Sequence, residues 1–252
     1  MARRAALGLS APLVRMLTLM CLPSRLRVRF LPIFLSALAV CACRGQQADP
    51  PAAPADSAPK RIFGIIPNYR TYPAERDYRA ISQRKKFSIA LEDSFDRGTF
   101  VLAAGFAGER QLNDNTPSFG QGLTGYARYL GTAYGDLVIG NFMTEAIYPA
   151  LLHQDPRYFR RGTGSAWSRV RYAVSRIFWT RTDSGGSTFN FSEVGGNATA
   201  VAIANAYYPD NRTAGAAVSA LAIQLGLDTA GNLLKEFWPD LSHALSRKPH
   251  AR

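Results

Sequence analysis

Apolar residues recur at the spacing of an amphipathic helix over most of the chain beyond residue 80. We expect helices where this spacing is not interrupted by Gly, Pro or clusters of turn-forming residues. No series of alternating strands is present in the pattern. The predicted helices cover residues 86–96, 100–112, 123–147, 167–179, 192–207 and 213–237. The pattern therefore predicts an all-α fold, a single compact bundle of about six helices.

Small residues recur four positions apart within four of these helices. Residues at this spacing share one face of a helix, and small side chains there let two helix backbones approach closely. We expect these faces to form the helix–helix contacts, because a Gly inside a helix costs roughly 0.5–1 kcal/mol relative to Ala and close packing would offset that cost. The sets are Ala103/Ala107, Ala127/Gly131/Gly135, Ala198/Ala202/Ala206 and Ala222/Gly226/Ala230.

The segment before the first helix, residues 61–70, is apolar but is broken by Gly64 and Pro67. The pattern offers it no strand partner. We therefore expect an extended N-terminal arm that lies along the helices and covers the core. A docking or lipid-contact segment is the alternative.

The first 43 residues have the pattern of a secretory signal peptide. They contain six Arg and no acidic residue, and they end in an apolar run over residues 30–40. A basic region, a short apolar region and small residues in this order are typical of export signals. Two processing routes stay open. One is ordinary cleavage after Ala42, and the other is a lipoprotein signal cleaved before Cys43, which would then carry the lipid.

Composition divides the remainder of the chain into three parts. Residues 44–60 are rich in Pro and Ala and contain no large apolar side chain, which predicts a disordered linker. The predicted helical domain covers residues 61–240. Residues 241–252 form a polar tail.

The charge of the chain changes once the signal is set aside. The formal net charge is +12, but six of the 30 basic residues lie before residue 44 and all 18 acidic residues lie after it, which leaves +6. This modest surplus, together with export, argues against nucleic acid as a partner. It favours anionic lipid, an envelope polymer or a protein partner, and a membrane-associated location in the periplasm or outer envelope.

Two uncharged runs follow the signal, over residues 194–209 and 213–227. Both are shorter than the roughly 20 apolar residues that a transmembrane helix needs. We therefore expect core helices of a tethered or peripheral protein. The alternative is an integral membrane protein with a C-terminal helical hairpin.

The stretch 153–160, with the sequence HQDPRYFR, is the densest in side chains that could carry chemistry. His153 and Asp155 are the candidates for acid–base catalysis, which would make the protein an envelope hydrolase. Two residues apart, they would not face each other on a helix, and Pro156 favours a turn. A structural role is favoured, in which Asp155 caps a turn and Arg157 pairs with a buried acid.

The sequence predicts no metal and no cofactor. All three Cys lie within residues 1–43, and His153 is the only His between residues 61 and 240, which excludes a His/Cys zinc site. The G-x-G-x-x-G pattern at residues 120–125 follows a polar loop and not a strand, so it does not predict dinucleotide binding.

Four acidic residues lie inside apolar helix patterns, where a charge needs a partner. We expect salt bridges between these acids and nearby arginines. The acids are Asp136, Glu145, Glu193 and Asp228, and the candidate arginines are Arg128, Arg169, Arg171 and Arg176.

Arginines and aromatic residues alternate through residues 157–181. Arg binds phosphate groups through several N–H donors, and aromatic side chains favour a membrane interface. The pattern therefore favours a non-enzymatic protein that binds its partner through the basic aromatic helix 167–179. A solvated basic face with aromatic side chains in the core is the alternative. The predicted ligand-binding residues are Arg157, Arg160, Trp167, Arg169, Arg171, Arg176 and Trp179.

Four motifs resemble a family of exported bacterial envelope proteins. They are RIFGIIPNYR at residues 61–70, GNFMTEAI at 140–147, LHQDPRYF at 152–159 and TRTDS at 180–184. The resemblance covers roughly residues 61–240 and implies export and a single domain. Because no activity is assigned to that family, the resemblance implies no catalytic residue.

Overall fold

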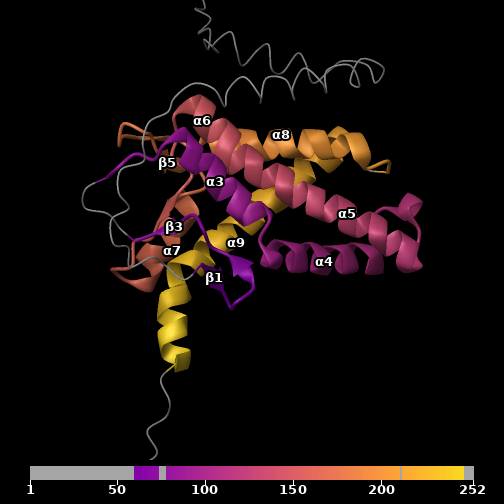
Figure 1. Cartoon of the computed structure of the whole chain (residues 1–252), viewed down its shortest axis with the longest axis horizontal. Coiled ribbons are helices and arrows are strands. Elements are labelled where there is room, and N and C mark those ends of the chain that lie inside the picture. Colours follow the sequence, from indigo (N-terminus) through magenta and orange to yellow (C-terminus); the bar gives the residue numbers. More distant parts are fainter. Residues whose placement is uncertain (1–59, 74–77, 211, 247–252) are drawn as a thin grey trace, which may run out of the picture. The chain divides into compact units, whose positions relative to one another are not determined.

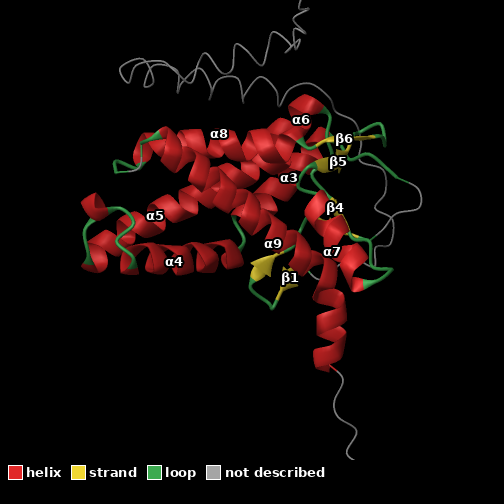
Figure 2. Cartoon of the chain, turned by 180° about the vertical axis from the view of Figure 1, so that it is seen from behind, coloured by secondary structure: helices red, strands yellow, loops and turns green. Residues whose placement is uncertain are grey.

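The computed structural model describes residues 60–73, 78–210 and 212–246, and these residues are mostly helical (Figures 1 and 2). The predicted all-α class is confirmed at this level. The predicted signal peptide, the lipidation site Cys43 and nearly all of the linker lie outside the described residues.

Seven α-helices occur in the described part of the chain, and α5 and α6 belong to one continuous rod. They are α3 (Gln83–Ser94), α4 (Arg97–Leu112), α5 (Gly122–Asn141), α6 (Tyr148–Leu152), α7 (Ala166–Ser175), α8 (Phe191–Tyr207) and α9 (Ala214–Ser246). A single 3-10 turn, Pro117–Phe119, lies between α4 and α5.

Side chains at the N-terminal ends explain where several helices begin. Ser82, Asp96, Ser165 and Asn190 each accept a hydrogen bond from a backbone N–H of the first turn of α3, α4, α7 and α8, respectively. These residue types are strongly preferred at this position because they satisfy N–H groups that have no partner within the helix. Asn190 is thus the cap of α8.

A π-helical segment, Phe142–Ile147, joins α5 to α6. Pro149 has no N–H to donate to the carbonyl of Glu145, four residues earlier, so regular α-helical bonding cannot continue there. The sequence predicts that the long helix ends before Pro149. The structure instead widens the helix by one π segment and continues it to Leu152.

Six short strands accompany the helices. They are β1 (Arg61–Ile62), β2 (Ile66–Pro67), β3 (Thr71–Tyr72), β4 (Tyr158–Phe159), β5 (Trp179–Arg181) and β6 (Ser187–Phe189). The predicted extended arm forms the antiparallel β1–β2 hairpin, and then β3 pairs in parallel with β4. The antiparallel pair β5–β6 takes in Trp179, so the helix predicted over 167–179 ends earlier, at Ser175.

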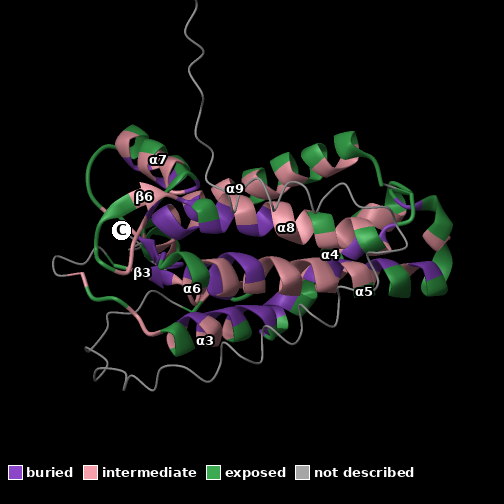
Figure 3. Cartoon of the chain, turned by 90° about the horizontal axis from the view of Figure 1, so that it is seen from above, coloured by how far each residue is buried: buried purple, intermediate pink, exposed green. Residues whose placement is uncertain are grey.

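Helix α5 lies between α4 and α8, and α9 crosses behind them and carries α7 at its C-terminal half (Figures 1 and 2). Ala103 and Ala107 of α4 pack on Tyr129 and Ala133 of α5 in a fully buried cluster. Figure 3 shows that the buried faces of the helices point towards one another and are narrow on α8 and α9.

The prediction that all four small-residue faces form helix contacts is wrong. Only the Ala103/Ala107 face is buried, whereas Gly131 of α5 and Gly226 of α9 have open space where a Cβ would stand. Ala222 and Ala230 are also exposed.

Close approaches occur at other glycines. A Cβ on Gly98 would stand 1.7 Å from the carbonyl oxygen of Ile65, and one on Gly196 would stand 3.1 Å from the backbone of Met143. Gly98 therefore lets the arm lie against α4, and Gly196 lets the π segment lie against α8.

Helix α9 is longer than the sequence predicts. It passes through Pro239 and beyond the predicted domain end at residue 240 to Ser246. By length and composition, Ala214–Leu245 is the one helix in the described part that could cross a membrane, and 6% of its most apolar window is buried.

Candidate functional site

Six ionisable side chains from five segments converge in the interior. The five segments lie far apart in the sequence, so the cluster exists only in the folded protein. The members are Arg70 of the arm, Asp93 of α3, Glu145 of the π segment, Glu193 of α8, and Asp228 and Lys235 of α9. We call this set the buried charge cluster.

Arg70 is at the centre of the buried charge cluster. Its Nη1 lies 3.5 Å from Glu145 Oε1 and 3.9 Å from Glu193 Oε2. Burial alone would lower the pKa of Arg70, but the carboxylates of Glu145 and Glu193 raise it above its ordinary value. Arg70 is therefore the fixed positive charge of the cluster.

The four acids form two carboxyl pairs. Asp93 lies close enough to Glu145, and Asp228 close enough to Glu193, to raise the pKa of the neighbouring glutamate. Burial, and then the charge of Asp93, raises the pKa of Glu145 well above its ordinary value. Burial, and then the charge of Asp228, raises the pKa of Glu193 to about 7.

One shared proton in each carboxyl pair would make the cluster electrically neutral. Each pair would then carry one negative charge, and Arg70 and Lys235 would supply two positive charges. Burial, followed by the charge of Arg70, lowers the pKa of Lys235 to about 8. Buried charges need this balance, because transfer of an unpaired charge from water is very costly. Chemically, the cluster can hold and exchange protons near neutral pH.

A recess leads from the surface to this cluster. The recess is lined by Arg70, Glu193 and Asn232, and also by Arg176, Arg181 and the exposed Trp179. The recess therefore connects the buried acids with the region that the sequence marks as basic and aromatic.

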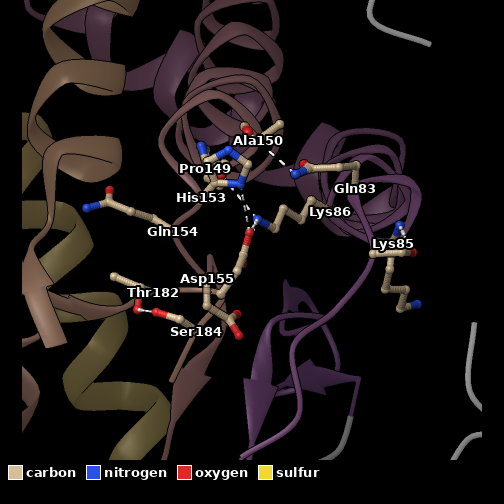
Figure 4. A network of polar contacts seen from close by, with 12 residues as sticks. Gln83, Lys85, Lys86, Pro149, Ala150, His153, Gln154, Asp155, Thr182 and Ser184 are labelled. Atoms are coloured by element: carbon tan, nitrogen blue, oxygen red, sulfur yellow. Dashed lines mark hydrogen bonds and ion pairs between the residues drawn. The ribbon is translucent and has the colours of Figure 1, made fainter. Parts of the chain in front are cut away.

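The two predicted catalytic candidates have separate surroundings. The side chain of His153 is 75% exposed, and its Nδ1 lies 3.7 Å from Asp183 Oδ2 (Figure 4). Asp183 also accepts two hydrogen bonds from the buried Lys86 Nζ, at 2.8 and 2.7 Å. His153 does not line the recess.

Asp155 is buried and fully engaged. It accepts hydrogen bonds from the Arg157 side chain at 2.7–3.1 Å and from Tyr78 Oη at 2.7 Å. Its Oδ1 also accepts the backbone N–H of Arg157, at 2.9 Å. This is the turn-capping and ion-pairing arrangement favoured for these residues, and the geometry gives Asp155 no contact with the His153 ring.

Two of the predicted ligand-binding arginines bind residues of α9. Arg169 donates from Nε to Glu236 Oε1 at 2.8 Å, and its Nη1 lies 2.6 Å from Asp240 Oδ2. Arg160 donates to the Glu236 carbonyl at 2.8 Å and to Asp240 at 3.1 Å. Their guanidinium groups therefore hold α9 against the preceding loop and α7.

The remaining predicted residues lie at or near the surface. Trp167 and Trp179 are 66% and 50% exposed, and Arg171 is exposed. Arg176 is half-buried, with its guanidinium 5.0 Å from the centre of the Tyr172 ring.

An aromatic surface surrounds Arg171. Trp167, Val174 and Phe178 recur at helical spacing along and just beyond α7, and all three are exposed. Phe189 contacts Phe178, Trp179 and Phe191, so the exposed side chains continue across β5 and β6 to the start of α8. We define the aromatic surface as Trp167, Arg171, Val174, Phe178, Trp179 and Phe191.

The expected salt-bridge partners differ from those observed. Asp136 pairs with Arg110 at 2.9 Å, and Arg128 donates to the carbonyl of Phe119. Among the described residues, none of the α7 arginines pairs with the four acids named from the sequence. Residues far apart in the chain supply the partners, and spacing along one helix cannot reveal them.

The residue pattern did not single out Arg70, Asp93, Lys235 or Glu236 as site residues. A signal was present for Lys235 and Glu236, because they follow the long apolar run of α9 and precede further apolar residues. In the described part of the chain, no three His, Cys, Asp or Glu side chains are placed to hold a metal ion.

Comparison with known proteins adds no assignment to these sites. No protein-family model, no curated protein and no solved structure matches the chain, so the resemblance to exported envelope proteins stays a prediction.

Proposed function

We propose that this protein is a non-enzymatic, membrane-associated protein of the bacterial envelope that docks on anionic lipid through its aromatic surface. The observation that carries the proposal is the exposure of Trp167, Phe178 and Trp179 along and just after α7, with Arg171 among them in the sequence. The predicted signal peptide supports an envelope location, and lipidation at Cys43 would add a second membrane contact.

The chemistry of this surface favours lipid over the other partners that the charge allows. Transfer of Trp and Phe side chains out of water is favourable, and Trp is favoured at the level of lipid headgroups. The guanidinium of Arg171 matches a headgroup phosphate. A single acyl chain gives only reversible membrane binding. A basic aromatic contact is the kind of second signal that makes the binding stable.

Flotation with lipid vesicles tests the proposal. The protein should float with vesicles of phosphatidylglycerol and phosphatidylcholine and should float much less with phosphatidylcholine alone. Raising NaCl to about 0.5 M should weaken flotation, because it screens the Arg171 contact. Trp167→Ser and Phe178→Ser should each reduce binding.

Leu123→Ser is the matched control, since Leu123 is 85% exposed on α5 and is not part of the aromatic surface. Equal flotation of the wild type, Trp167→Ser and Leu123→Ser would refute docking through the aromatic surface.

One further observation favours a second candidate, an integral membrane protein with the α8–α9 hairpin inserted. Val218, Ile223 and Leu227 are exposed along the first half of α9, within the helix that is long and apolar enough to cross a membrane. Extraction of membranes with alkaline carbonate separates the two. With Cys43→Ala, which removes the predicted lipidation site, a peripheral protein is released into the supernatant and an inserted hairpin stays in the pellet.

A further inference from the structure

The recess beside the aromatic surface contains more arginine than acid. Arg70, Arg157, Arg176 and Arg181 line it, and Asp155 and Glu193 are its acidic residues. The chain therefore places an excess of positive charge in a concave site that opens next to Trp179.

Two of these arginines are neutralised inside the protein. Asp155 binds Arg157 through both carboxylate oxygens, and Glu193 lies 3.9 Å from Arg70. The neutral polar groups of the wall are engaged as well. Thr180 donates to the Asp155 carbonyl, and Ser192 donates to Gln154.

Arg176 and Arg181 are left with positive charge to offer. Among the described residues, neither has an ion pair with an acid, and both stack on aromatic rings. Arg176 lies over Tyr172, and Arg181 lies 4.7 Å from the centre of Phe159 and 5.2 Å from that of Tyr78. Stacking fixes the plane of a guanidinium and leaves its N–H groups free to meet an acceptor.

An unsatisfied donor marks the same place. The Nε–H of Arg176 is buried and has no hydrogen-bond acceptor in the described structure. A buried N–H without an acceptor is rare in folded proteins because it loses its bond to water and gains none in return. Arg176 lines the recess, so its guanidinium has hydrogen-bonding capacity to spare beside it.

We propose that the recess binds the phosphate group of an anionic phospholipid between Arg176 and Arg181. The inference rests on the proposed function and names the site that would bind the lipid headgroup. Oxygens of a phosphate match the planar N–H groups of arginine. The glycerol and acyl chains would leave past Trp179, which lines the recess and is half exposed, and would lie on Phe178 and Phe191.

Binding of two soluble probes tests this site without a membrane. Inorganic phosphate and dihexanoyl phosphatidylglycerol below its micelle concentration are titrated into the protein, and binding is measured by calorimetry at constant ionic strength. Both should bind, the lipid at least about tenfold more tightly because its chains add apolar contact. Arg176→Gln and Arg181→Gln should each weaken binding of both probes about tenfold or more.

Arg84→Gln is the control, because Arg84 is exposed on α3, lies outside the aromatic surface and does not line the recess. It should leave binding of inorganic phosphate unchanged. Arg176→Lys separates charge from geometry and should recover part of the loss. Thermal unfolding of each variant verifies that it is folded.

The results distinguish this inference from the proposed function. Equal affinity for the two probes would overturn the assignment to lipid. Binding that is absent, or that survives both Arg176→Gln and Arg181→Gln, would overturn the site itself. The proposed function fails separately, through loss of vesicle flotation by the wild type or no effect of Trp167→Ser.

Discussion

Glu236 shows how single residues fix the C-terminal part of the molecule. Its carboxylate is fully buried and accepts hydrogen bonds from Tyr158 Oη at 2.9 Å, from Arg169 Nε at 2.8 Å and from two backbone N–H groups of the loop at Arg161 and Gly162. A carboxylate with four donors is well stabilised in the interior. Removal of one partner of such a pair leaves a buried charge without compensation.

We expect Glu236→Ala to destabilise the protein by about 3–5 kcal/mol, because Arg169 would stay buried without its main acceptor. Urea unfolding followed by circular dichroism measures the change. Asp240→Asn is the control, since Asp240 also contacts Arg169 but has a side chain 51% exposed. It should cost less than about 1 kcal/mol. Equal losses for the two variants would contradict the central role of Glu236.

Glu193 should make stability depend on pH. Its pKa is about 7 in the folded protein and near 4.5 in the unfolded chain. Between these values the folded protein binds more protons at Glu193 than the unfolded chain does, so stability falls as pH rises from about 4.5 to about 7. The change amounts to about 2–3 kcal/mol.

Glu193→Gln tests this sign, because the amide has the charge and shape of the protonated acid. The variant should match the wild type near pH 5 and be more stable near pH 8, as measured by thermal unfolding. Some pH dependence should persist, because Glu145 also has a raised pKa. In Glu92→Gln, a change at a partly exposed residue of α3, the pH profile should follow the wild type. A wild-type stability that rises between pH 5 and 7 would contradict this account.

Two glycines of one element, α4, have opposite surroundings. Gly98 lies in its first turn against the carbonyl of Ile65, and Gly108 lies near its C-terminal end with open space around it. We expect Gly98→Ala to cost more than about 2 kcal/mol, because backbone would have to move. Gly108→Ala should stabilise the protein by about 0.5–1 kcal/mol, because Ala is the better helix former. Chemical unfolding of both variants makes the comparison, and a stable Gly98→Ala variant would show that the arm does not lie against α4.

Local signals account for the elements that the sequence predicts correctly. Helices α3, α4 and α8 have a capping side chain and an uninterrupted apolar pattern, and both are readable within one segment. The strands are different. Thr71 pairs with Tyr158, 87 positions away, in strands of two residues, and no local pattern can specify such a partner.

Helix α7 shows a second limit of prediction from the residue pattern. Its arginines suggest a solvated basic face, yet Arg169 faces the interior and Trp167 faces solvent. The reason lies in α9, where Glu236 provides the buried acceptor. A charged residue points outward by default, and only the tertiary partner reverses this preference.

At the scale of the whole molecule, the candidate site forms where side chains from distant segments of the chain come together. The sequence marks Glu145, Glu193 and Asp228 as acids within apolar patterns, but it gives no sign that Arg70 of the arm joins them. The recess likewise gathers side chains from the arm, β4, β5 and three helical segments. The exposed apolar side chains of the aromatic surface are the part of the site that the sequence did indicate, through Trp167 and Trp179.

Quenching of tryptophan fluorescence by brominated lipid tests docking through this surface most directly. The chain has three Trp, and Trp238 is packed against Phe63 of the arm with ring centres 4.5 Å apart. Variants that retain one Trp each, with Phe at the other two positions, report the depth of each side chain in vesicles that contain phosphatidylglycerol. We predict strong quenching of Trp167 and Trp179 and weak quenching of Trp238. Quenching of Trp238 alone, or of none of the three, would contradict the account.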